Sequence, residues 1–156
     1  MQVSYVIAPT FTRPNDATAY ADGDLVANST TAGSVVPLKF GIPWKRSCII
    51  RGASIRKSDG ADVVNATFTL HLFRNTPVVA NGDNGALSTD YAEKLGSIAV
   101  GAQTGYTDDG YSISFAGNFY VDAIDRFVYG LLEAKGVYTP AALETFVVTL
   151  IIEQAQ

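Results

Sequence analysis

The side chains that most often perform catalysis are scarce in this sequence. It contains one histidine, His71, and one cysteine, Cys48. His71 stands among apolar residues in "VNATFTLHLF", a setting more typical of a surface or interface residue than of a base or ligand. A serine or cysteine nucleophile needs a base that a third group orients, and the sequence marks out no such set. We therefore expect a protein that is not an enzyme and has no catalytic residues.

Acidic, glycine-containing stretches are the next candidates, because their oxygens could bind calcium. They are "ADGD" at 21–24, "NGDNG" at 81–85 and "DDG" at 108–110. None follows the twelve-residue pattern of alternating ligands that ends in a distal Glu. Asn, Asp and Gly also form turns, since they tolerate positive φ and bond their own backbone. We expect turns at these positions, with no bound metal and no cofactor.

Basic residues gather in one part of a chain whose net charge is −4. Such a charge argues against direct binding of nucleic acid. No Asp or Glu occurs between Asp24 and Asp59, whereas six basic residues lie between Lys39 and Lys57. This region is either a pair of solvated strand faces or a docking patch for an acidic partner surface. The candidate docking residues within it are Lys45, Arg46, Arg51 and Arg56.

The elements that would position these residues are strands. Apolar and polar residues alternate with a period of two in the ranges 33–40, 47–58, 66–73, 110–122, 126–134 and 145–154. Clusters of Gly, Asn, Asp and Pro separate them, and only 87–97 is compatible with a helical turn. The pattern predicts an all-β fold of seven or eight strands, a two-sheet antiparallel β-sandwich resembling a jelly roll. Residues 75–110 would hold a connection between the sheets.

Domain organisation and core follow from the same pattern. The 156 residues suit one domain, 1–156, in which 1–30 form an N-terminal lead-in segment. No apolar run is long enough to cross a bilayer, so we expect no membrane contact. A single cysteine fits synthesis in a reducing cytosol. The predicted core residues are Phe68, Leu70, Leu72, Phe127, Phe146, Val148 and Leu150.

The last predicted strand, 145–154, is apolar on both faces. If Phe146, Val148 and Leu150 face the core, Val147 and Ile151 face outward. A strand that is apolar on both faces is usually covered on both. The cover could be a loop of the same chain or a neighbouring subunit, and we name Val147 and Ile151 as candidate oligomer-interface residues.

Parts of the sequence also resemble a known group of proteins. "TRPNDATAYADGDLVANS" resembles a segment near the N-terminus of small structural proteins of tailed bacteriophages, where a form close to RPADTTAYAAGDVVA stands. The central "LHLF" strand with its following proline and "DN" turn, and the C-terminal "YTPAALETFVVTLIIEQ", are similar to the same group. The resemblance extends from about Phe11 onward. The sequence departs from the commonest motif form at Asn15, Ala17 and Asp22.

The resemblance implies a virion component without enzymatic activity, most plausibly a capsid decoration (cement) protein. Such proteins commonly are β-sandwiches that sit as trimers on the outer shell, which makes the major capsid protein and a homotrimer the expected partners. The expected location is the outer capsid surface, after synthesis in the cytoplasm of a bacterial host. Within the motif, Tyr20 would anchor the lead-in segment by packing and Gly23 would supply an unusual φ. Arg13 would pair outward, which adds Arg13 and Tyr20 to the candidate docking residues.

Two alternatives remain open. The chain could be a carbohydrate-binding module on a head or tail fibre, because Tyr106 and Tyr111 flank Asp108 and Asp109 and jelly rolls often bind sugars. It could also be a head–tail connector or another tail component. It would then still be a structural protein of the virion, but at a different location.

Overall fold

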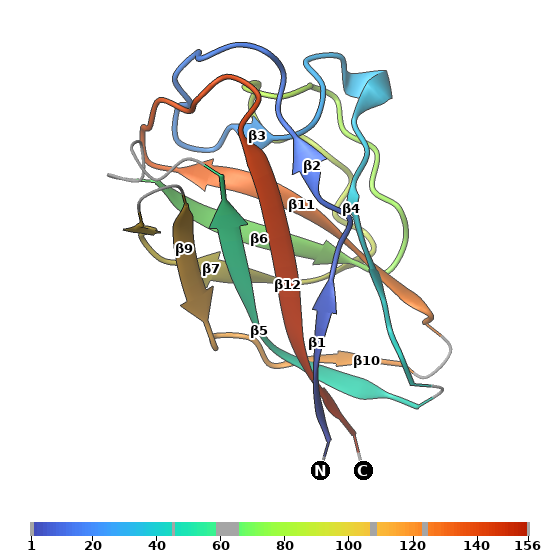
Figure 1. The fold of residues 1–156 in the computed structure, drawn as a ribbon. Coiled ribbons are helices and arrows are strands. Elements are labelled where there is room, and N and C mark those ends of the chain that lie inside the picture. The colour runs from blue at the N-terminus through green and yellow to red at the C-terminus, as the bar shows by residue number, and fades with distance from the viewer. Residues whose placement is uncertain (1, 45, 59–65, 107–108, 123–124, 156) are drawn as a thin grey trace.

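Two antiparallel β-sheets pack face to face in the computed structural model of this chain, which describes residues 2–44, 46–58, 66–106, 109–122 and 125–155 (Figure 1). The larger sheet has seven strands: β1 (Val3–Ile7), β2 (Phe11–Thr12), β5 (Cys48–Lys57), β8 (Thr104–Gly105), β9 (Gly110–Ser114), β10 (Phe119–Val121) and β12 (Thr145–Gln154). The smaller has five: β3 (Leu25–Val26), β4 (Leu38–Gly41), β6 (Thr67–Phe73), β7 (Lys94–Val100) and β11 (Phe127–Lys135). The predicted all-β sandwich is confirmed.

The strand order is that of a jelly roll. Within the described ranges, eight strands have four or more residues: β1, β4, β5, β6, β7, β9, β11 and β12. They divide into the orders β1-β12-β5-β9 and β4-β11-β6-β7, so strands distant in the sequence lie side by side. The first and last strands, β1 and β12, are neighbours, and both chain ends lie at the same end of the sandwich (Figure 1). Jelly-roll sheets arise when two Greek keys fold over one another.

The core lies between the sheets and follows the period-two pattern. Phe68, Leu70 and Leu72 of β6 are at most 1% exposed, as are Phe146, Val148 and Leu150 of β12. These six predicted core residues are confirmed. Close packing also depends on glycine: a Cβ on Gly96 of β7 would lie 2.1 Å from the ring of Phe119 in the opposite sheet. Glycine at this position therefore makes room for an aromatic ring in the core.

Phe127 is the one incorrect core assignment. Its side chain is 40% exposed, and the ammonium group of Lys39 lies 4.0 Å from its ring centroid. In β11 the inward positions are Val128, Gly130, Leu132 and Ala134, so Phe127 belongs to the opposite face. The predicted alternation within 126–134 was therefore correct, but the face that includes Phe127 was wrongly assigned to the core.

Three element boundaries also differ from expectation. The range 110–122 holds two strands, β9 and β10, which pair with successive parts of β5. Residues 33–40 hold the end of a 3-10 turn (Ala32–Ser34) and most of β4. No helical turn forms at 87–97, because β7 begins at Lys94 after a turn at 92–93. Within 75–110, the long segment after β6 leads to β7 of the same sheet. The expected connection between the sheets is also present there, because residues 101–103 lead from β7 of the smaller sheet to β8 of the larger one.

A second apolar cluster lies on the outer side of the smaller sheet. It contains Phe73 of β6, Leu131 of β11 and Val79 of the segment between β6 and β7, together with Leu25 and Ala27. The β6–β7 segment therefore covers part of this face.

Candidate interaction surface

The outer face of the larger sheet can be identified from strand register. Ile151 of β12 is paired with Tyr5 of β1 and with Gly52 of β5. Directly paired residues share a face of the sheet. Because Leu150 and Ile152 are fully buried between the sheets, the Tyr5–Ile151–Gly52 row faces away from the core.

Large apolar side chains are exposed across this outer face and at its margin. Their exposures are 50% for Val3, 67% for Tyr5, 62% for Ile7, 42% for Ile113, 66% for Phe115 and 60% for Tyr120. We call these six residues the outer apolar surface. Single exposed apolar residues are common, but a group on one side of a sheet is typical of an interaction site.

Two ion pairs cross this face between the apolar residues. The Arg51 guanidinium lies 2.7 Å from Glu153 and also donates to Asn118 Oδ1 at 2.8 Å. Arg56 lies 2.5 Å from Asp109. Both arginines are partly or largely exposed, so solvent screens these pairs. Aromatic residues and arginine, which are both present on this face, are enriched at protein–protein interfaces.

The predicted basic docking patch is divided in space. Arg46 and Lys39 are exposed, but Arg51 and Arg56 already pair with carboxylates of this chain. Lys57 is fully buried and donates to Glu144. Lys45 lies outside the described residues. The run of basic residues in the sequence therefore does not form one continuous set of outward charges.

Arg13 and Tyr20 are interior residues, and their assignment to an outward docking surface is wrong. Arg13 is 1% exposed and Tyr20 is fully buried. The Arg13 Nη2 atom lies 2.9 Å from Asp83 Oδ2, and its Nε donates to the Tyr20 hydroxyl. Tyr20 in turn donates to Asp83 Oδ1 at 2.5 Å, and the Ala27 amide donates to the same oxygen at 2.8 Å.

This buried Arg13–Tyr20–Asp83 cluster joins the lead-in segment to the turn at 81–85. Burial acts to lower the pKa of Arg13, but Tyr20 and Asp83 outweigh it, so the net pKa is raised. Burial, followed by the Asp83 charge, raises the pKa of the Tyr20 hydroxyl. Arginine thus stays charged and tyrosine stays neutral, as the hydrogen bonds require. Tyr20 also stacks on Tyr138 at 5.1 Å between ring centroids, which confirms its anchoring by packing.

Gly23 follows this cluster and has φ of +93°, which confirms the expected unusual backbone conformation. Residues with a Cβ rarely adopt that region, so glycine allows the chain to turn into β3.

The two candidate oligomer-interface residues have different surroundings. Val147 is half-buried on the outer face, opposite Arg56. Ile151 is on the same face but only 3% exposed within the single chain. Ile151 is therefore covered within its own chain, as in the first of the two alternatives, and does not need a second subunit to cover it. Whether Val147 and Ile151 contact another subunit stays a prediction.

His71 lies on the outer face of the smaller sheet and has partners on both ring nitrogens. Its Nε2 is 2.7 Å from Glu133 Oε2, and its Nδ1 is 3.0 Å from Ser97 Oγ. Burial lowers the pKa of His71, and the Glu133 hydrogen bond opposes this only in part. The neutral ring can then donate to Glu133 and accept from Ser97. Sequence reasoning missed both partners, which are 62 and 26 residues away.

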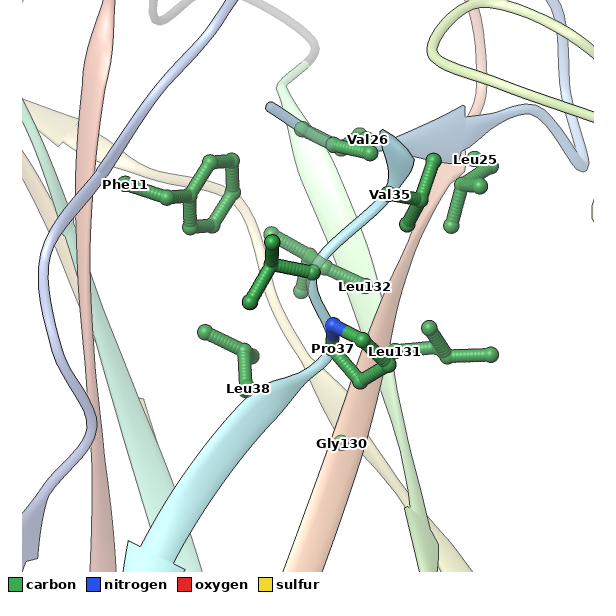
Figure 2. Close-up of a pocket in the computed structure, with 11 residues that line it drawn as sticks. Phe11, Leu25, Val26, Val35, Pro37, Leu38, Gly130, Leu131 and Leu132 are labelled. Carbon is green, nitrogen blue, oxygen red and sulfur yellow. The ribbon is translucent and has the colours of Figure 1, made fainter. Parts of the chain in front are cut away.

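An apolar pocket opens along one side of the sandwich. Figure 2 shows Phe11 of β2 facing Leu38 of β4 and Leu132 of β11, so the pocket lies where the two sheets meet. A groove of about 450 Å³ adjoins it and shares Phe11 and Leu38. The polar residues that line this groove are Thr10, Thr12, Asn28 and Lys39, and the Asn28 amide group is already bonded to the Ser34 carbonyl and the Val36 amide. Its apolar lining does not mark out a particular ligand.

The carbohydrate-site residues are only partly described. Tyr106 is 59% exposed, and Tyr111 is half-buried beside Arg56. Asp109 is engaged by Arg56, while Asp108 lies outside the described residues. Across the described ranges, no group of three or more His, Cys, Asp or Glu side chains is placed to hold a metal ion. In the same ranges, no helix has the length and apolar character needed to cross a membrane.

Comparisons with known proteins identify no family for this chain, so it is classified by its fold. No family model matches the sequence, and no curated protein matches it. One similar solved structure is described as "Structure of infectious bursal disease virus Gt strain", with 12% identity and a TM-score of 0.30. The match covers 98% of this chain and 36% of that one. Because that TM-score is too low to carry an argument, the classification rests on strand order. The chain is an all-β protein with a jelly-roll β-sandwich.

Proposed function

We propose that this protein is a non-enzymatic structural component of a virion. More specifically, it is a capsid decoration protein that binds the outer surface of the major capsid protein shell and stabilises it. The observation that carries the proposal is the outer apolar surface, which presents exposed apolar side chains from β1 and from the β9–β10 region of one sheet and is crossed by ion pairs. The sequence similarity to small structural proteins of tailed phages supplies the class of partner.

The mechanism is linkage between binding and assembly. A ligand that binds only the assembled shell stabilises that shell by mass action. The β9–β10 half of the outer apolar surface, with Ile113, Phe115 and Tyr120, offers the contact, because aromatic and aliphatic groups contribute most when an interface excludes water. Assembly as a homotrimer, as the resemblance implies, would multiply weak contacts through avidity.

The test is co-sedimentation with purified phage shells that lack the protein. We expect the wild-type chain to pellet with the shells and to raise their disruption temperature. Replacing Ile113 and Phe115 by Ser should abolish pelleting while the circular dichroism melting curve is retained. Val137→Ser is the matched control, because Val137 is 64% exposed in the turn after β11, away from this surface. Equal loss in the control, or full binding by the double variant, would count against the proposal.

The carbohydrate-binding alternative predicts a different result. Tyr120 and Phe115 lie near the Arg51–Asn118 pair, an arrangement of aromatic and planar polar groups that suits a sugar. A glycan array that reports specific saccharide binding, lost in Tyr120→Ala, would favour this function. Binding to shells without saccharide binding favours decoration.

A further inference from the structure

β1 forms a free edge of the larger sheet. It pairs with β12 on one side, and no described strand pairs with its other side. Exposed edge strands present unpaired N–H and C=O groups, and natural proteins usually protect them with a charge, a proline, a bulge or a cover. The sequence of β1, VSYVI, contains no charge and no proline, and its register with β12 is regular.

The unpaired backbone groups of β1 can be assigned from the hydrogen-bond alternation. The Ala8 amide donates to the Val148 carbonyl at 3.0 Å, and the Gln154 amide donates to the Gln2 carbonyl at 3.0 Å. In an antiparallel pair, hydrogen-bonded residues alternate with residues whose polar groups point away from the partner. Even-numbered β1 residues therefore bond to β12, and Val3, Tyr5 and Ile7 direct their backbone groups outward.

The same three residues carry exposed side chains. Val3, Tyr5 and Ile7 are 50%, 67% and 62% exposed. One strand thus presents three outward amide–carbonyl sets together with three apolar side chains on one face. A second strand placed along this edge would satisfy the backbone groups and bury the side chains.

We propose that the occupant of this edge is β1 of a second copy of the chain, in an antiparallel pairing about a twofold axis at Tyr5. That register places Val3 opposite Ile7 of the second copy and Tyr5 opposite its own equivalent. All three pairs are of the hydrogen-bonded type, because all three residues direct their polar groups to the free edge.

Charge and side-chain pattern favour the second copy over a different strand. A twofold axis brings each group of β1 close to its own equivalent, so any charge near the centre would meet a like charge. β1 has none, and the nearby Glu153 is neutralised by Arg51. Aromatic pairs and aromatic–aliphatic neighbours are favourable across strands. The pairing would extend the sheet from one sandwich into the next.

This assembly differs from the homotrimer implied by sequence resemblance, and it does not depend on the proposed capsid function. The β1 edge makes a twofold contact, while the β9–β10 half of the outer face stays accessible. The oligomeric state in solution decides between the two assemblies.

The first experiment is sedimentation of the full chain over a range of concentrations. We expect a monomer–dimer equilibrium. Tyr5→Lys places two ammonium groups across the axis and should weaken dimerisation by roughly tenfold or more. The matched control is Tyr106→Lys, since Tyr106 is similarly exposed but lies beyond β8. It should dimerise as the wild type does. At concentrations low enough for all three chains to be monomeric, both variants should keep the wild-type melting temperature, because dimerisation itself raises it.

The second experiment tests the register. Residues in a hydrogen-bonded antiparallel pair have Cα atoms about 5.5 Å apart, within the range that a disulfide spans. Tyr5→Cys should therefore form a covalent dimer under mild oxidation. Val3→Cys should not, because two Val3 positions would be offset by four residues, or about 13 Å. Cys48 is fully buried and does not compete.

If the wild-type chain stays monomeric at high concentration, the proposal is wrong. The same result is expected if a strand of another protein, and not a second copy, occupies the edge. A trimer that Tyr5→Lys leaves intact also overturns the proposal. Cross-linking of Val3→Cys as complete as that of Tyr5→Cys would refute the register.

Discussion

Asp83→Ala is the change that should most sharply test the buried Arg13–Tyr20–Asp83 cluster. Asp83 accepts hydrogen bonds from the Arg13 guanidinium, the Tyr20 hydroxyl and the Ala27 amide. Asp83→Ala removes the carboxylate that lies 2.9 Å from the Arg13 guanidinium. Because Arg13 is only 1% exposed, its charge stays buried without this partner. Removing one partner of a buried pair typically costs about 3–5 kcal/mol.

That cost is a large fraction of the stability of a domain, which is about 5–15 kcal/mol. For a chain of this length, 1 kcal/mol corresponds to about 2–4 °C in melting temperature. Asp83→Ala should therefore lower the melting temperature by about 6–20 °C, measured by circular dichroism, and lower the free energy of unfolding in urea.

Two controls separate the buried pair from a general effect of losing a carboxylate. Asp16→Ala removes the other carboxylate near Arg13, which lies 3.6 Å away and is partly exposed, and should cost at most about 1 kcal/mol. The double change Arg13→Met with Asp83→Ala removes both charges. It should be less destabilising than the sum of the single changes, because no uncompensated charge is left behind. An Asp83→Ala cost below about 1 kcal/mol, or additive single effects, would refute the reasoning.

Three further changes test the core, the packing between the sheets and the histidine. Phe146→Ala should cost about 3–5 kcal/mol in urea unfolding and the exposed Phe127→Ala about 1 kcal/mol or less, and equal costs would contradict their placement. Gly96→Val should lower the melting temperature strongly, because its Cβ would overlap the Phe119 ring, and an unchanged melting curve would disprove that contact. Burial lowers the pKa of His71 below its unfolded value near 6.5, so its contribution is complete above that pH and declines as pH falls. The stability advantage of wild type over His71→Gln should therefore shrink between pH 7.5 and 5.5, and a constant difference would contradict the shift.

The alternation of residue types was enough to predict the sandwich and most of its core. In β6 and β12, threonines mark outward positions, so period two identifies the inward residues directly, because successive side chains point to opposite faces. At Phe127 the pattern was insufficient. The residue begins its strand, and the side on which β11 meets the other sheet depends on tertiary packing.

The two docking assignments that burial contradicts, Arg13 and Tyr20, were wrong for a related reason. Sequence composition reports which residues are charged but not which carboxylate a distant turn will place beside them. Asp83 is 70 residues from Arg13, and Glu144 is 87 residues from Lys57. Long-range strand pairing creates these buried pairs, so a local run of basic residues looked more exposed than it is. Ile151 shows the same limit, since its cover within the chain cannot be seen in its own strand.

The placement of the motif residues changes what the sequence resemblance can mean. Arg13 and Tyr20 belong to the segment that is similar to phage structural proteins, yet both are internal and hold the lead-in segment against the 81–85 turn. A motif of this kind specifies how the chain folds, because its residues satisfy one another inside the molecule. The partner contacts proposed above accordingly use exposed residues outside the motif, such as Tyr5 on the β1 edge and Phe115 on the β9–β10 half of the face. Because the motif residues are internal and the outer apolar surface is not, we expect changes to the outer apolar surface to alter binding without altering the fold.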